Sequence, residues 1–217
     1  MKFLNYDSKF SRTMIKLCYA CFLNLLWMIC SLPIITIGAS TTALYYACLK
    51  IVREEEYDAA GMFFRSFKQN FKQGTVIWLI LLAFGIFLGA DGYILYHLRA
   101  NSTGAPAVLW TLLIAIVIAA AVLYVIVLLY IFPLLASVEN TTFNMFKYAF
   151  MIGTHYLFST ILMFAVHFAM FYIIVAVFTP MFLMGEGLCA MICSWMIKNI
   201  LKSVTYDPNP PVDTSED

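Results

Sequence analysis

Charged residues are scarce in this chain. Only 12% of its 217 residues are Asp, Glu, Lys or Arg, whereas a soluble domain usually carries about a quarter. Hydrophobic residues make up 63% and the mean hydropathy is +0.88. A chain of this length has no interior large enough to bury that surplus, so lipid must surround much of it. The composition excludes an ordinary soluble domain and predicts an all-α, polytopic transmembrane helix bundle.

An excess of charge of either sign is also missing. The net charge is +1, so there is no basic field of the kind that binds nucleic acid, and we expect no nucleic-acid partner. The six cysteines all lie within apolar runs, and Cys18 and Cys21 form a CxxC with no second pair in a polar loop. Buried cysteines of this kind usually serve packing. We therefore expect no metal site and no cofactor.

Catalytic motifs are absent as well. The sequence contains no GxxxxGK[ST], GxGxxG, HExxH or GxSxG pattern, so it predicts a protein that is not an enzyme and has no catalytic residues. His155 and His167 are twelve positions apart with no acidic residue three or four positions away, which favours hydrogen bonding across helices over metal binding. Asp91 and Glu186 are possible solute or proton contacts, because intramembrane carboxylates are often functional. For Asp91 the alternative is a solvated side chain, or one that reaches Arg99.

Six apolar runs are long enough to be considered as membrane spans. A single transmembrane domain over residues 1–203 would be followed by a disordered, acidic cytoplasmic tail over 204–217. The run at 148–177 is longer than one membrane crossing, so it is expected to tilt, to kink near Gly153 or to start below the membrane. Five spans with a re-entrant 34–52 segment are the alternative. The predicted spans are approximately 17–32, 34–52, 75–98, 107–132, 148–177 and 188–201.

The distribution of Lys and Arg predicts the orientation. With six spans and a cytoplasmic N-terminus, Arg99 alone among the 13 basic residues lies outside. If 34–52 does not cross, the Lys and Arg residues are divided much more evenly between the two sides of the membrane. The positive-inside rule therefore favours six spans with both termini in the cytoplasm.

The second run carries small residues at helical spacing. Gly38 is followed by Thr42, and Ala39 by Ala43 and Ala47, each four positions apart. This spacing lets transmembrane helices approach closely, so 34–52 is expected to be a buried span. Asn24 in the first run is expected to face other helices, because an unpaired amide in hydrocarbon is costly.

A Phe-rich, basic segment follows the second run. Asp58 is expected to be the N-cap of a helix over about 59–72. At 100° per residue its four phenylalanines fall on one face, with a basic stripe beside them. The pattern predicts an amphipathic helix in the cytoplasmic interface, whose Phe face could also enter a partner's groove. The alternative is a helix packed beneath the bundle. The interface candidates are Phe63, Phe64, Phe67, Phe71, Arg65, Lys68 and Lys72.

A set of short segments, mostly within about fifty residues near the N-terminus, shares a distinctive pattern: 24–27, 31–38, 42–45, Arg53, Glu55, Phe63-Phe64 and 67–73, and later 132–136. In these segments the sequence resembles the YesL family of bacterial integral membrane proteins. The family's function is poorly defined, and its members are often encoded beside ABC importers of oligosaccharides. The resemblance implies a multi-pass protein of the bacterial cell membrane and supplies no catalytic residues.

The sequence is consistent with two functions from different classes. The first is a non-enzymatic auxiliary subunit or helper of an oligosaccharide ABC importer, bound to its permease or ATPase. The alternative is a small-solute membrane carrier that uses an intramembrane carboxylate, Asp91 or Glu186.

Overall fold

The computed structural model of the protein describes residues 9–205. In this part of the chain there are seven α-helices and no β-strand. A 3₁₀ turn, Ile34–Thr36, precedes α2, while a π-helix, Ile173–Val177, and a 3₁₀ turn, Thr179–Leu183, join α6 to α7. The helices are α1 (Lys9–Cys30), α2 (Ile37–Val52), α3 (Ala59–Ala100), α4 (Ala105–Leu135), α5 (Thr142–His155), α6 (Leu157–Tyr172) and α7 (Gly185–Thr205).

The predicted all-α membrane bundle is confirmed. Five segments within residues 9–205 are long and apolar enough to cross a membrane: Thr13–Cys30, Ile34–Val52, Ala59–Ala100, Ala105–Leu135 and Leu157–Val177. The sixth predicted span, 188–201, lies in α7, which is not among these five, so the number of crossings and the side of each terminus stay predictions. Most of the predicted acidic tail lies beyond the described residues.

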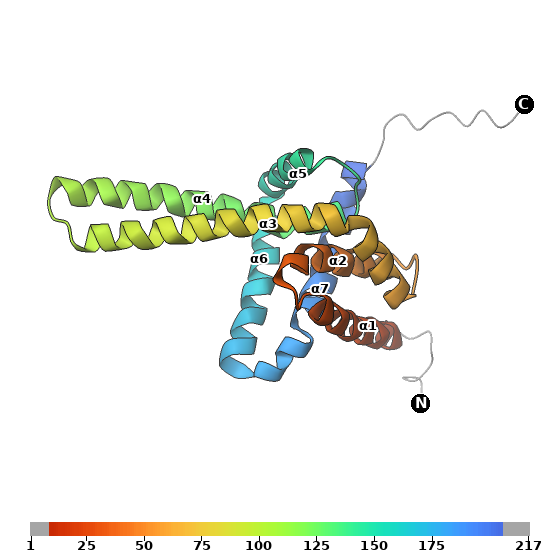
Figure 1. The fold of residues 1–217 in the computed structure, drawn as a ribbon. Helices are drawn as coiled ribbons and strands as arrows, with labels where there is room; N and C mark the ends of the chain where they lie inside the picture. Colours follow the sequence, from red (N-terminus) through yellow and green to blue (C-terminus); the bar gives the residue numbers. More distant parts are fainter. Residues whose placement is uncertain (1–8, 206–217) are drawn as a thin grey trace, which may run out of the picture.

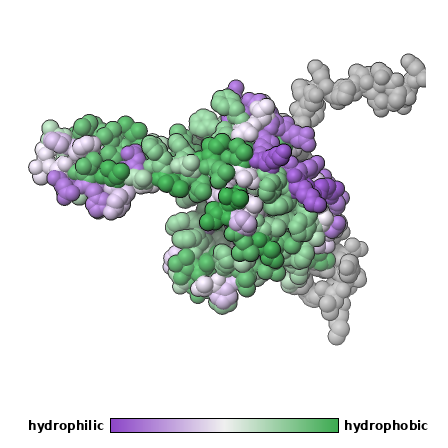
Figure 2. Space-filling model, in the orientation of Figure 1, coloured by the Kyte–Doolittle hydropathy of each residue, from purple (hydrophilic) through white to green (hydrophobic). Residues whose placement is uncertain are grey.

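Two helical hairpins extend from a common centre in different directions (Figure 1). The α3–α4 hairpin reaches far beyond the other helices, while α6 and the start of α7 form the second hairpin. Hydrophilic residues gather where α2 ends and α3 begins, and again at the tip of the α3–α4 hairpin (Figure 2). The surface between these two polar regions is mainly hydrophobic, as lipid contact requires.

Helix α2 is the buried centre of this arrangement. It packs against α1, α3, α4 and α7, and the five small residues singled out in the sequence are all buried. The α2–α3 contact is especially close, since a Cβ added to Gly74 would lie 3.0 Å from the Cα of Ala39. A Cβ added to Gly38 would collide with the Gly74 carbonyl oxygen and with Trp78. Small side chains therefore determine how closely the two backbones approach.

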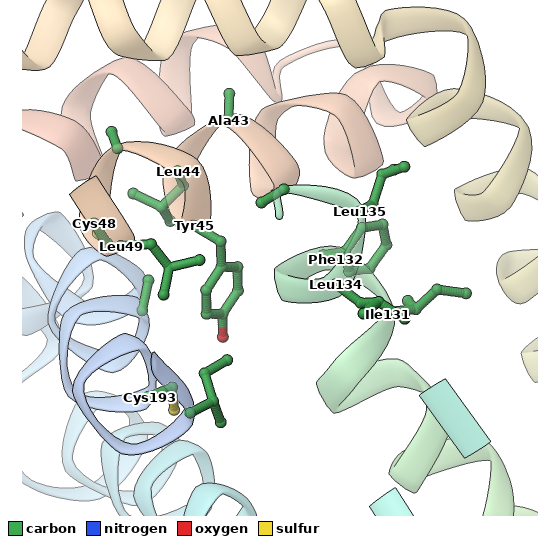
Figure 3. Close-up of a cluster of buried hydrophobic side chains, with 14 of the residues drawn as sticks. Ala43, Leu44, Tyr45, Cys48, Leu49, Ile131, Phe132, Leu134, Leu135 and Cys193 are labelled. Atoms are coloured by element: carbon green, nitrogen blue, oxygen red, sulfur yellow. The ribbon is translucent and has the colours of Figure 1, made fainter. Parts of the chain in front are cut away.

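Around α2 the core is completed by larger side chains from α4 and α7. In Figure 3, Tyr45 extends from α2 towards Cys193 of α7, and Phe132 and Leu135 of α4 lie to its other side. Tyr130 of α4 is also buried, and its hydroxyl accepts a hydrogen bond of 3.1 Å from Thr160 of α6. The polar groups of these tyrosines are thus enclosed by protein rather than lipid.

The sequence predicts a separate helix for the Phe-rich segment, and this prediction is wrong. The predicted interfacial helix and the predicted third span form one continuous helix, α3, of 42 residues. Asp58 does cap it, because its Oδ1 accepts a hydrogen bond of 3.1 Å from the Gly61 N–H. Gly74 does not break the helix. Its missing side chain admits α2 instead.

The predicted long helix over 148–177 is interrupted. Helix α5 ends at His155, two residues after the predicted kink at Gly153, and α6 starts at Leu157. The Thr160 hydroxyl also lies 2.8 Å from the Gly153 carbonyl oxygen, so a side chain from α6 reaches back over the break. Gly153 itself packs against Ile126 and Tyr130 of α4, which leaves no room for a Cβ.

Replacing Gly38 with alanine tests the close contact between α2 and α3. Alanine favours helices by up to about 1 kcal/mol over glycine, so an open position would be stabilised. At Gly38 the new methyl group would collide with backbone, and we expect a net loss of about 1–3 kcal/mol. The measurement is the thermal unfolding midpoint of the purified protein in one detergent.

Gly89→Ala is the matched control, because a Cβ at Gly89, on the neighbouring helix α3, meets nothing within 4 Å. We expect its unfolding midpoint to be unchanged or raised. Equal midpoints for the two variants would contradict the packing assigned to α2.

Candidate functional site

A small cavity lies where α1, α6 and α7 meet. Its volume is about 140 Å³, and it is closed on one side by the π-helix and the 3₁₀ turn that connect α6 to α7. π-Helical turns are rare and occur frequently at functional sites. The lining residues are Trp27, His167, Met170, Phe171, Ile174, Phe182, Gly185, Glu186 and Cys189.

Asn24 of α1 holds the start of α7 in place beside this cavity. Its Nδ2 donates to the Phe182 carbonyl oxygen at 3.2 Å, and its Oδ1 accepts from the Gly187 N–H at 2.8 Å. Gly187 has no side chain, which lets its backbone lie against Ala20 of α1. The expectation that Asn24 faces other helices is confirmed, since its side chain is fully buried.

The two ring N–H groups of the cavity wall are already engaged. The Nδ1 of His167 lies 2.9 Å from the Met163 carbonyl oxygen. A carbonyl only accepts, so in the neutral ring Nδ1 carries the proton and Nε2 is left as an acceptor. The Nε1 of Trp27 donates to the Thr41 hydroxyl at 3.0 Å. The indole therefore presents its ring, and not its N–H, to the cavity.

Glu186 lines the same cavity from the first turn of α7. It is partly buried, and within the described residues no hydrogen bond or ion pair satisfies its carboxylate. The position at a helix N-terminus is favourable for negative charge. The sequence had singled out Glu186 but not its nearness to His167, because the two lie on successive helices joined by the π-helical turn.

Asp91 is in a different part of the molecule. It lies on the α3–α4 hairpin, towards the tip, and is partly exposed. The suggested contact with Arg99 is not formed. The Arg99 Nε donates to the Thr111 hydroxyl at 2.8 Å. The structure thus does not bring Asp91 and Glu186 together in one site.

The predicted Phe face of α3 is divided between core and surface. Phe63 is fully buried and Phe67 packs partly against the core, whereas Phe64 and Phe71 remain 44% and 40% exposed. The exposed pair shares one side of the helix with Lys68 and Lys72, neither of which forms an ion pair within the described residues. We call Phe64, Lys68, Phe71 and Lys72 the outer Phe–Lys face.

Ion pairs order the connection between α2 and α3 next to this face. Arg65 contacts both carboxylate oxygens of Glu56, at 2.7 and 2.9 Å, and so is less available to a partner than the two lysines. Exposed pairs of this kind contribute little stability singly, about 0–1 kcal/mol, but together they fix the path of the connection. The further pairs are Lys16–Glu54, Lys50–Glu55 and Arg53–Glu55.

A groove of about 560 Å³ opens between α1 and the first turn of α3. Met14, Cys18 and Phe22 line its apolar part, and Asp58 also lines it.

Within the part of the chain that the structure describes, no three His, Cys, Asp or Glu side chains are grouped to hold a metal ion.

The fold and these features define a helical protein with several helices that could cross a membrane. Residues 20–92 match a family model described as a protein of unknown function, DUF624. The match includes the buried helix α2, the ion-paired connection and the outer Phe–Lys face, and ends within α3. No curated protein and no solved structure matches the chain.

Replacing Asn24 with alanine tests the link between α1 and α7. The Gly187 N–H and the Phe182 carbonyl would lose their partner, which costs about 1–3 kcal/mol for buried polar groups. We expect a lower thermal unfolding midpoint. Asn101→Ala, at the exposed C-terminal end of α3, is the control and should change the midpoint much less. Similar midpoints would show that Asn24 does not hold the two helices.

Proposed function

We propose that this protein is a non-enzymatic accessory subunit or helper of an oligosaccharide ABC importer, and that it is a YesL-family protein of the bacterial cell membrane. The family match over residues 20–92 leaves the function open. The resemblance of residues 24–73 to YesL proteins supports the association with an importer. The charged connection between α2 and α3 then lies in the cytoplasm, as do both termini, in accordance with the positive-inside rule.

The observation that carries this proposal is the outer Phe–Lys face. Two large aromatic rings and two lysines, which form no ion pair with residues 13–201, share one side of a helix whose other side is fixed in the core. Aromatic residues are enriched at the centres of protein interfaces, and unpaired cations favour a partner surface that carries acidic groups. The partner we propose is an acidic, partly apolar cytoplasmic segment of the importer's permease or ATPase.

The interior supports a helper more than a carrier of sugars. A cavity of about 150 Å³ accommodates a ring of benzene size, and the cavity at Glu186 has a volume of about 140 Å³. A single hexose has twice as many non-hydrogen atoms as benzene, and an oligosaccharide is larger still. The cavity therefore offers no room for the importer's cargo.

A small-solute carrier is the second candidate. The observation that favours it is the Glu186 carboxylate, which lines a cavity together with His167. Asp91 is not part of this cavity, so under this alternative Glu186→Gln would abolish flux into proteoliposomes and Asp91→Asn would not. Flux of small solutes that both variants leave unchanged would remove the carrier proposal.

The test of the accessory role is co-purification with the importer after Phe64→Ala and Phe71→Ala are combined. Both rings are exposed, so we expect normal membrane insertion and at least a tenfold loss of co-purified permease or ATPase. The measurement is quantitative mass spectrometry of the tagged protein isolated in mild detergent. Phe63 is unsuitable for this purpose, because truncating a buried Phe costs about 3–5 kcal/mol of stability.

Phe158→Ala combined with Phe168→Ala provides the matched control. These two rings on α6 are 82% and 60% exposed, and are expected to face lipid. The control should keep its partners. An equal loss in both double variants, or unchanged recovery from the Phe64/Phe71 variant, would count against the outer Phe–Lys face as the interface.

A further inference from the structure

We propose that the cavity between α1, α6 and α7 binds a small organic ammonium ion, with Glu186 as its counter-charge. This site is separate from the outer Phe–Lys face and does not depend on the accessory role. It does not require transport either, since binding alone would satisfy the groups that line the cavity.

The polar side chains that line the cavity favour a ligand that carries positive charge. The indole N–H of Trp27 is bound to Thr41, and the Nδ1–H of His167 to the Met163 carbonyl oxygen. The groups left over are acceptors, namely the Glu186 carboxylate and the His167 Nε2. Cys189 adds only a thiol, which is a weak donor. Among these side chains an anion would find no strong donor, whereas a cation meets a carboxylate.

Aromatic rings complete the environment of a cation. Trp27 and Phe171 line the cavity from α1 and α6, and Phe182 lines it from the turn before α7. The faces of such rings attract cations, and aromatic cages recognise quaternary ammonium groups. Phe171 and Phe182 are 65% and 49% exposed, so this part of the cavity wall lies at the surface of the protein.

Size and ligand count decide between an organic cation and a metal ion. Glu186, His167 and Cys189 do not form a group that could hold a metal within the described residues. A volume of about 140 Å³ suits a compact ion of about five or six non-hydrogen atoms, by comparison with benzene in a cavity of similar size. Methylated or short-chain ammonium ions are therefore the chemical class we assign.

The partly buried Glu186 carboxylate needs a positively charged partner more than an exposed carboxylate would. Ionised groups removed from water are costly unless they are paired. Within residues 13–201 Glu186 forms no hydrogen bond and no salt bridge, and the side chain that interacts favourably with its charge is His167. Its backbone position is fixed, because the Gly187 N–H donates to the buried Asn24 side chain. The site is thus held ready by protein contacts that do not use the carboxylate itself.

The experiment uses tetramethylammonium chloride as the probe and the full-length protein in lipid nanodiscs. Sodium chloride keeps the ionic strength constant. A ligand that binds the folded state raises the unfolding midpoint as its concentration increases, and isothermal titration gives the dissociation constant. We expect saturable binding to the native protein. Glu186→Gln, which keeps the shape but removes the charge, should bind at least tenfold more weakly.

Two controls distinguish a cation site from an apolar hollow. Glu139→Gln removes the same charge from an exposed loop and should bind as the native protein does. tert-Butanol, a neutral molecule of similar size, should bind at least tenfold more weakly than tetramethylammonium. Equal binding of the two molecules, or cation binding that Glu186→Gln leaves unchanged, would overturn the proposal.

A second variant keeps the test decisive if Glu186→Gln does not fold. Ile174→Phe leaves the carboxylate in place and fills the cavity from the π-helix. We expect it to abolish tetramethylammonium binding. Retention of native affinity in this variant would place the ion elsewhere and refute the site, as would the absence of saturable binding to the native protein.

Discussion

The close packing of α2 against its neighbours is the constraint on which the rest of the structure depends. Helices in lipid gain little from the hydrophobic effect when they associate, so they need contact at short range or hydrogen bonds. Gly38 and Ala39 meet Gly74 of α3 with no side chain between the backbones. Once α2 is enclosed, α1, α4 and α7 have a surface on which to pack, and the two hairpins can extend outward with lipid around them.

Residues whose role depends on local spacing could be predicted from the sequence. The small residues of α2 and the Asp58 cap both act within a few positions along one helix, and the helical periodicity alone places them. Asn24 was predictable for a different reason, because an amide in an apolar run has few alternatives to a buried partner. Its actual partners, at Phe182 and Gly187, are about 160 positions away and could not be read from the pattern.

The cavity escaped prediction because it is assembled from separate elements. His167 has no acidic residue at helical spacing on α6, and Glu186 was visible only as an isolated acid near glycines. A π-helix and a 3₁₀ turn reverse the chain between them. Pro180 and the nearby glycines indicate the 3₁₀ turn in the sequence, but the π-helix lies in a plain apolar run. The hydrogen bonds of the Trp27 and His167 rings complete the site. These bonds determine which polar atoms remain for the proposed ligand, and they depend on tertiary packing that the sequence pattern does not specify.

Helix α3 shows why a correct pattern led to a wrong boundary. Its 42 residues would be about 63 Å long, which is roughly twice the hydrocarbon thickness of a bilayer. The first turns carry charge and the outer Phe–Lys face, while the part beyond Gly74 is apolar, so the sequence changes character where the surroundings change. The backbone does not need to break at that point, because Gly74 is where α2 lies closest. One rigid element therefore connects the proposed partner surface directly to the long hairpin, and a partner bound at one end would fix the orientation of the other.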